Sequence, residues 1–217
     1  MYDYNWADKI NTLCKWIYKL VILHVIWILF SLLGLIVLGV FPATIAMFTV
    51  IRKWVKHDID YSIFEIFLDT YKTEFWKGNG LGYILFFIGG LLYLDFRIVQ
   101  SFENTLLALS GYFFLCMLCL FAVVMLYVFP TYAHFQLSMF GYIKQAFLMT
   151  LINPFRSLVL FITSFAILVI MMQISIIFAI FGITILAYVT MRFTLGTYYK
   201  VLEKEEKLLV RDAYQEK

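Results

Sequence analysis

Two long stretches of this chain carry no Asp, Glu, Lys or Arg, and they set its architecture. The first runs from Leu20 to Ile51 and stops at Arg52-Lys53-Trp54, and the second runs from Ser157 to Met191. One membrane-spanning helix needs ~20 apolar residues, because ~30 Å of hydrocarbon is crossed at ~1.5 Å per residue. Each stretch is too long for one ordinary span and short for two. How each stretch divides therefore decides the topology.

The remaining pattern predicts further helices. In residues 1–19, apolar side chains recur at helical spacing opposite charged ones, which predicts an amphipathic helix that approaches the bilayer. Spans are expected from about Gly78 to Leu94 and from Thr105 to Phe129. The loops at 52–77 and 130–156 repeat apolar residues every four positions, which predicts an amphipathic surface helix in each.

Composition makes lipid the main solvent of the chain. Hydrophobic residues make up 64% and charged residues 14%, against ~25% charged in a typical soluble domain, and the mean hydropathy is +0.90. The net charge of +3 is too small to indicate nucleic-acid binding, and three cysteines imply no disulfide framework. We expect residues 1–217 to form a single integral membrane domain, with a polar tail at 192–217.

Lysine and arginine counts predict the orientation. The loop at 52–77 has five, the loop at 130–156 two and the tail from Arg192 six, whereas the loop at 95–104 has one. Because basic loops stay in the cytoplasm, the first three regions and the C-terminus are expected there. The second stretch must then cross twice, with its turn near Met172-Gln173-Ile174-Ser175.

The first stretch leaves two topologies open. A turn around Gly39-Val40-Phe41-Pro42 gives two crossings, an N-terminus inside and six spans, which the lysines before residue 20 favour. A single span from Leu20 to Phe41, with an interfacial helix at 43–55, gives five. A weak repeat of the 63–75 pattern at 143–155 and a second Val-Phe-Pro at 128–130 favour five. We predict an all-α polytopic transmembrane bundle of six spans, with five as the alternative and with amphipathic cytoplasmic loop helices.

Few residues offer chemistry. Cys116 and Cys119 form a Cys-x-x-Cys, but they lie mid-span without a nearby cation, so packing is favoured over redox or metal chemistry. His24 lies near the end of a span, where a hydrogen-bonded histidine is favoured over a proton relay. The candidate intramembrane polar residues are His24, Asp95, Arg97 and Gln173, with the charged pair expected at the wet outer rim.

Motifs for ATP binding, serine nucleophiles and metal-ligating histidines are absent from the sequence. We therefore expect no enzyme activity and no catalytic, cofactor-binding or metal-binding residue. The loop at 52–77 instead gathers aromatic side chains that favour either an interfacial helix or a docking surface for a protein partner. The candidate docking residues are Phe64, Phe67, Tyr71, Phe75 and Trp76.

Several segments resemble the YesL family of bacterial integral membrane proteins. They are the stretch from Phe41 to Trp54, Ile63 to Phe75 in part, Tyr93-Leu94-Asp95, Tyr127 to Phe135, Ala146-Phe147 and Asn153-Pro154. The family has no agreed catalytic residues, and its genes often lie beside those for carbohydrate ABC importers and polysaccharide-degrading enzymes in Gram-positive bacteria. The resemblance therefore implies an accessory role in sugar uptake across the cell membrane. The chain lacks the Glu-Ala-Ala…Gly loop by which importer permeases hold their ATPase.

Three functional hypotheses follow. The leading one is a non-enzymatic membrane protein that associates with the permease or ATPase subunits of a carbohydrate ABC importer. The alternative is a small transporter or channel in its own right, with homo-oligomer formation. A redox protein that uses Cys116 and Cys119 is the third.

Overall fold

The computed structural model describes residues 6–56, 62–102, 105–173 and 175–215, and all regular structure within them is helical. The eight helices of this described part are α1 (Trp6–Leu33), α2 (Val40–Val55), α3 (Ile63–Thr73), α4 (Phe75–Gln100), α5 (Thr105–His134), α6 (Met139–Ile152), α7 (Pro154–Gln173) and α8 (Ser175–Gln215). The all-α expectation is confirmed. Four described segments are long and apolar enough to cross a membrane: Lys9–Leu33, Phe75–Gln100, Leu109–His134 and Pro154–Gln173.

The first uncharged stretch divides earlier than either sequence-based topology expected. Helix α1 continues the N-terminal segment without a break to Leu33, and a turn at residues 34–39 leads into α2. Pro42 lies in the first turn of α2, where a missing N–H leaves no helical hydrogen bond unmade. The α2 segment is not a surface helix, because nine of its residues are buried in the protein. This helix contacts α1, α3, α4, α5 and α8, so it is the centre of the fold.

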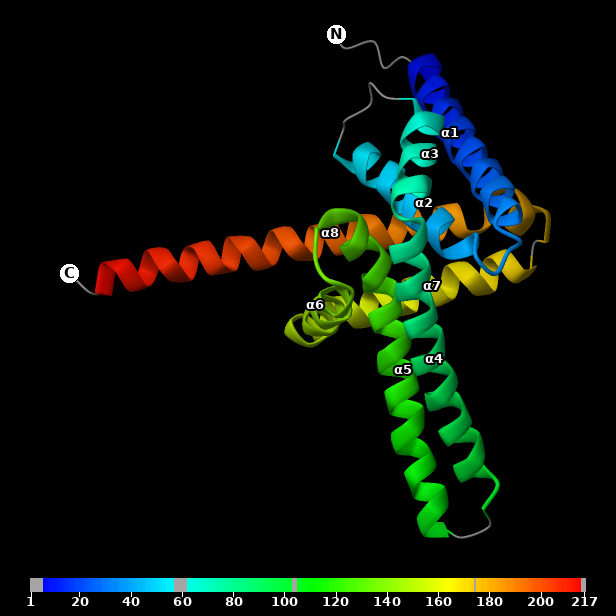
Figure 1. Cartoon of the computed structure of the whole chain (residues 1–217). Helices are drawn as coiled ribbons and strands as arrows, with labels where there is room; N and C mark the ends of the chain where they lie inside the picture. Colours follow the sequence, from blue (N-terminus) through cyan, green and yellow to red (C-terminus); the bar gives the residue numbers. More distant parts are fainter. Residues whose placement is uncertain (1–5, 57–61, 103–104, 174, 216–217) are drawn as a thin grey trace.

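Helices α4 and α5 form a long hairpin that extends beyond the other helices (Figure 1). Helix α4 continues to Gln100, so Asp95 and Arg97 belong to it rather than to the expected loop. Helix α5 likewise runs past the expected end at Phe129 and contains Pro130. Charged residues can end the apolar part of a membrane helix without ending the helix. Its backbone hydrogen bonds then continue into the interface.

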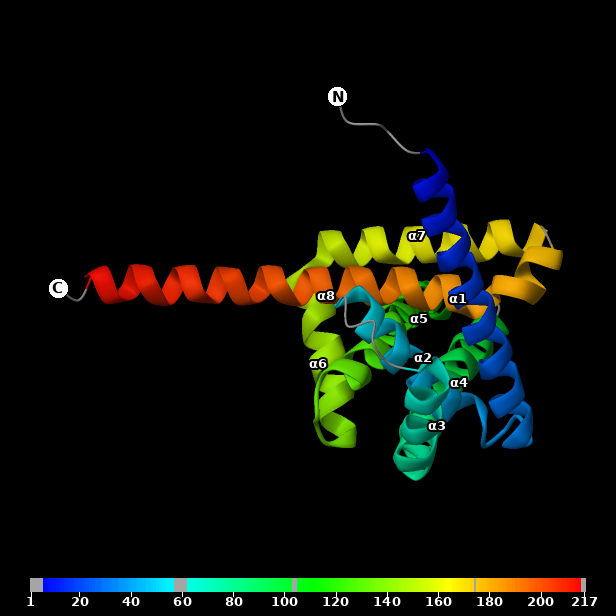
Figure 2. The same cartoon turned by 90° about the horizontal axis from the view of Figure 1, so that it is seen from above.

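The second uncharged stretch divides into α7 and α8, as the sequence predicted. The two helices lie side by side in both views, crossing the direction of α4 and α5 (Figures 1 and 2). Residue 174 of the expected turn lies outside the described residues. Helix α8 has a kink at Gly182 and then runs on through the tail to Gln215, so the polar tail is helical over most of its length. The count of six spans stays a prediction.

The predicted loop helices are present as α3 and α6, which come before α4 and α7. Both expected amphipathic helices are confirmed as helices, but α3 is not a purely superficial one. Phe67 of α3 is fully buried in the cluster that also contains Leu23 and Phe30 of α1 and Met47 of α2. A second buried cluster joins α4, α5 and α6 around Leu85, Tyr127 and Tyr142.

Candidate functional site

A polar cavity of about 420 Å³ opens where α2, the end of α3 and the end of α5 meet. Its polar lining includes Thr49, Arg52, Thr70, Glu74, Tyr132, His134 and Gln136. An adjoining cavity of about 360 Å³ shares Glu74, Tyr132 and Gln136 and adds Lys77. Together they form the polar site described below, which lies next to the apolar spans and has the size of a small-ligand pocket.

Arg52 reaches the polar site because it follows the buried face of α2. It belongs to the last turn of that helix, where a basic side chain interacts favourably with the free carbonyl groups. Burial lowers the pKa of the Arg52 guanidinium below its usual value. The side chain remains a cation, so it brings a partly desolvated positive charge to the cavity wall.

Glu74 and Tyr132 also line the polar site. Glu74 separates α3 from α4, and the Tyr132 hydroxyl on α5 donates a hydrogen bond of 2.6 Å to its Oε2. The rings of Tyr132 and Tyr142 lie with their centroids 4.3 Å apart, and the Tyr142 hydroxyl donates to the carbonyl of Phe135 at 3.3 Å. The carboxylate is therefore held in place by a charge-assisted hydrogen bond and a packed aromatic pair.

His134 ends α5 and lines the same cavity. Its ring stacks on Tyr198 of α8 at 5.9 Å and meets the edge of Phe135 at 4.6 Å. The Nδ1 atom is buried and has no hydrogen-bond partner in the described part of the chain. A buried polar atom without a partner costs ~1–3 kcal/mol, so its position beside a cavity is typical of a site that binds a polar molecule.

The polar site combines one partly buried cation, one oriented carboxylate, an amide and several hydroxyl groups. This set can hydrogen-bond a small polar molecule and stack its apolar face on Tyr132 or Tyr142. Among the described residues, no group of three or more His, Cys, Asp or Glu side chains could hold a metal ion.

The candidate intramembrane residue His24 is 4% exposed and packs between α1 and α8. Its Nδ1 lies 3.2 Å from Thr184 Oγ1, and its ring stacks on Trp27 at 5.9 Å. A Cβ at Gly182, the kink residue of α8, would lie 2.9 Å from the imidazole. The imidazole therefore packs directly against the backbone at Gly182, where there is no room for a side chain. Its contact with Thr184 agrees with the interpretation of His24 as a hydrogen-bonded residue.

The other three candidate intramembrane residues lie apart from His24 and from the polar site. Asp95 and Arg97 are exposed near the end of α4, and Gln173 is exposed at the end of α7. The structure does not bring these four residues together into one site.

The candidate docking residues form a row of aromatic contacts that begins inside the protein. Phe67 and Tyr71 both pack on Phe30, with centroids 5.1 and 5.0 Å away, and Tyr71 contacts Phe75 at 5.5 Å. The Phe75 ring then meets Trp76 at 5.5 Å. Trp76 is 80% exposed and Phe64 50%, so these two offer the accessible surface while Phe67 supports it from within.

The two cysteines of the Cys-x-x-Cys are free thiols on the outer surface of α5. They line neither of the two cavities of the polar site.

Sequence reasoning missed the polar site, because its residues come from three separate elements. One signal was available: two of the segments that carry the family resemblance, 41–54 and 127–135, supply Arg52, Tyr132 and His134 to one cavity. The polar residues of one segment are too far along the sequence from those of the other to form a recognisable motif.

Comparison with known proteins gives a consistent answer. Residues 20–96 match the family described as "Protein of unknown function, DUF624". The chain is 37% identical over 148 residues to the uncharacterized protein YesL of Bacillus subtilis (strain 168), covering 68% of this chain and 69% of YesL. It is 37% identical over 149 residues to YesV, covering 68% and 71%, and 29% identical over 205 residues to YteU, covering 93% and 92%, both uncharacterized proteins of the same organism.

No solved structure matches the chain. The matched family segment contains the second half of α1, all of α2 and α3 and most of α4, and the similarity to YteU extends over almost the whole length. On these similarities and its apolar helices, the chain is a membrane protein that belongs to the YesL-like DUF624 family.

Proposed function

We propose that this protein is a non-enzymatic accessory component of a carbohydrate ABC import system, held in the cell membrane with its C-terminus in the cytoplasm. The observation that supports this proposal is the exposure of two large aromatic side chains, Phe64 in the first turn of α3 and Trp76 in the first turn of α4. Large aromatic side chains are the residue type on which protein interfaces most depend. The kind of partner is inferred from the genes for carbohydrate ABC importers that often lie beside those of the family.

The exposed Trp76 is preorganised for a contact. The Trp76 ring meets the edge of Phe75, and Phe75 is held by Tyr71, which packs on Phe30. Because this contact already restricts the Trp76 side chain, less side-chain entropy is lost when a partner covers it. Lys72 and Lys77 lie on either side of Phe75 and Trp76 in the sequence, and such basic residues support a position of this surface at the cytoplasmic edge of the spans. The partner is a permease or ATPase subunit that presents an apolar pocket with an acidic rim.

Co-purification tests the proposal. The tagged protein is extracted in mild detergent from its own host, and transporter subunits are identified by mass spectrometry. We expect an importer permease or ATPase in wild type and its loss in Trp76→Ala and in Phe64→Ala. Recovery of no transporter subunit at any stoichiometry contradicts the proposal.

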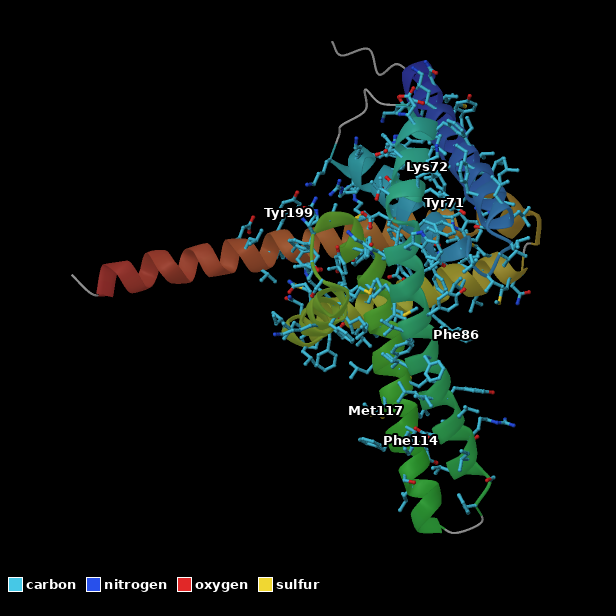
Figure 3. All side chains as sticks on the ribbon, viewed as in Figure 1. Tyr71, Lys72, Phe86, Phe114, Met117 and Tyr199 are labelled. Carbon is cyan, nitrogen blue, oxygen red and sulfur yellow. The ribbon has the colours of Figure 1, made fainter. Side chains whose placement is uncertain are left out.

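A matched control comes from the same helix. Phe86 of α4 is 72% exposed, close to the 80% of Trp76, but it lies within the apolar span, on the extended part of the hairpin (Figure 3). Phe86→Ala should retain the partner if the cytoplasmic surface makes the contact. Loss in Phe86→Ala with retention in Trp76→Ala assigns the contact to the lipid-facing spans instead.

The polar site favours a second candidate, a small transporter or channel in its own right. A cavity of about 420 Å³ whose lining includes both Arg52 and Glu74 suits a polar solute. Purified protein alone in liposomes should then give uptake or conductance that Arg52→Ala reduces. Importer-dependent uptake in cells without activity in liposomes supports the accessory role over this one.

A further inference from the structure

The turn between α1 and α2 exposes only apolar side chains. Leu35 is 80% exposed and Val37 65%, and Leu33, Ile36 and Leu38 are exposed as well. The segment from Leu32 to Val40 contains no polar side chain at all. A run of exposed aliphatic residues at the tip of a hairpin is typical of a surface that contacts lipid or another apolar partner.

The backbone amides of this turn need no water. The N–H groups of residues 34 to 40 all donate to carbonyl oxygens within residues 30–36, over N···O distances of 2.7 to 3.2 Å. Gly34 and Gly39 allow this compactness, because a Cβ at Gly34 would lie 2.3 Å from the Gly39 Cα. Irregular backbone is tolerated inside a membrane only where its polar groups are satisfied by the protein, and this turn meets that condition.

The carbonyl groups of the turn receive side-chain donors from other helices. Tyr83 of α4 donates to the Val37 oxygen at 3.0 Å, and Asn79 of α4 donates to the Leu38 oxygen at 2.9 Å. Tyr71 of α3 donates to the Phe30 oxygen at 3.1 Å. Polar side chains from two neighbouring helices thus complete the hydrogen bonding of a turn that is otherwise surrounded by apolar groups.

Helix α4 provides a scale for the depth of the turn. Its uncharged part between Lys77 and Asp95 is about 27 Å long at ~1.5 Å per residue, which suits one crossing of ~30 Å of hydrocarbon. Asn79 and Tyr83, which contact the turn, lie only about 3 Å and 9 Å beyond Lys77 on that scale. Figure 1 shows the same relation, with the turn beside the first part of α4 and the α4–α5 hairpin extending well beyond it.

The two limbs of the hairpin are too short for a full crossing, and for the turn to lie at this depth they must be strongly tilted from the membrane normal. The uncharged part of α1, from Leu20 to Leu33, is about 21 Å long, and that of α2, from Val40 to Ile51, is about 18 Å long. Both are shorter than the hydrocarbon layer. The candidate span Lys9–Leu33 crosses the hydrocarbon only by including Lys9, Lys15 and Lys19. With Lys19 and Arg52 at one interface instead, neither limb reaches the opposite one.

We propose that α1 and α2 form a re-entrant hairpin whose turn at residues 34–39 lies within the hydrocarbon, in direct contact with lipid acyl chains. Both ends of the hairpin lie at the same surface of the membrane as Lys77. This topology differs from six spans, in which the turn reaches the outer water, and from five, in which the N-terminus is outside. It does not depend on the proposed role in sugar import.

Lipid is the occupant that the surroundings favour. The exposed apolar surface continues from the turn along α1 through Leu29 and Leu32, as it does along α4 through Phe86. A patch continuous with the lipid-facing surface of two helices has the same solvent as those helices.

Single cysteines in a background of Cys14→Ser, Cys116→Ser and Cys119→Ser test the proposal. Ile36→Cys and Val37→Cys probe the turn, Ser101→Cys probes the far loop of α4 and α5, and Ser62→Cys probes the segment before α3. A membrane-impermeant maleimide is applied to intact cells and to inside-out vesicles. We expect Ser101→Cys to react from one side, Ser62→Cys from the other and both turn variants from neither until detergent is added.

A nitroxide at Ile36→Cys in liposomes supplies a positive signal. We expect its collisions with oxygen to exceed those with a water-soluble nickel chelate at least several-fold, as in hydrocarbon. Labelling of the turn variants from the Ser101→Cys side overturns the proposal in favour of a full crossing. Spin–spin broadening, with weak collisions to both reagents, overturns it in favour of a second copy as the occupant.

Discussion

A methyl group added at Gly82 tests how closely α2 packs on α4. A Cβ there would lie 2.2, 2.3 and 2.5 Å from Cγ, Cδ1 and Cδ2 of Phe41, the part of the ring nearest its own backbone. Gly78, one turn earlier, approaches α2 as well, since its Cβ would lie 3.5 Å from the Pro42 Cα. The pair is a Gly-x-x-x-Gly contact, through which membrane helices bring their backbones together.

The magnitude follows from two opposing effects. Alanine in a helix interior is favoured over glycine by ~1 kcal/mol, which raises the free energy of unfolding. Overpacking against a ring that cannot move without its backbone costs ~1–3 kcal/mol. Gly90 of the same helix has open space around its Cα, so Gly90→Ala experiences the first effect alone. We expect Gly90→Ala to be stabilised by up to about 1 kcal/mol and Gly82→Ala to lie about 1–3 kcal/mol below it.

The assay is reversible unfolding of the purified protein in mild detergent by added SDS, followed by circular dichroism, for wild type and both variants. A Gly82→Ala protein as stable as Gly90→Ala refutes the packing of Phe41 against α4. That result also removes the support for the depth of the turn, because Asn79 and Tyr83 reach the turn from the same face of α4.

Three further predictions concern other parts of the molecule. Ile36 has a φ of 65°, which strains a β-branched residue, so Ile36→Gly should raise the free energy of unfolding by up to about 1 kcal/mol in the same SDS titration. A double-mutant cycle of His24→Phe and Thr184→Val should show a coupling of about 0.6 kcal/mol, the average for side-chain hydrogen bonds between membrane helices, and zero coupling contradicts the 3.2 Å contact. Replacing both Cys116 and Cys119 by serine should change stability by less than about 0.5 kcal/mol and leave partner recovery intact; loss of partner recovery revives the redox hypothesis.

The long helices were predictable because lipid imposes their length and composition. The pattern located α4, α5, α7 and the uncharged start of α8 to within a few residues on their apolar parts. Their ends were less predictable, since Asp95 and Arg97 mark where the apolar part stops and not where the helix stops. Backbone hydrogen bonds continue through the interface, where charged side chains meet water at no cost.

The short helices show what periodicity leaves undetermined. Spacing placed an apolar face on α3 but did not say what covers it, and Phe64 and Phe67 differ in exposure although both are aromatic and three residues apart. Phe67 is buried because Phe30 of α1 packs on it. That contact depends on where the first uncharged stretch divides, which the charges on either side left open.

Hydrogen bonding explains why so few polar residues of this chain are candidates for function. In a membrane, backbone groups and side chains that no water can reach need polar side chains as their hydrogen-bond partners. Asn79, Tyr83 and His24 meet such requirements at the turn and at the kink of α8. At the polar site, His134 Nδ1 is buried without a partner and Arg52 is partly desolvated at the same cavity. Other buried polar atoms of the described residues, such as Asn79 Oδ1 and Ser164 Oγ, also lack a partner, but His134 and Arg52 line a polar cavity. A small polar ligand of this protein is therefore expected to contact these two residues.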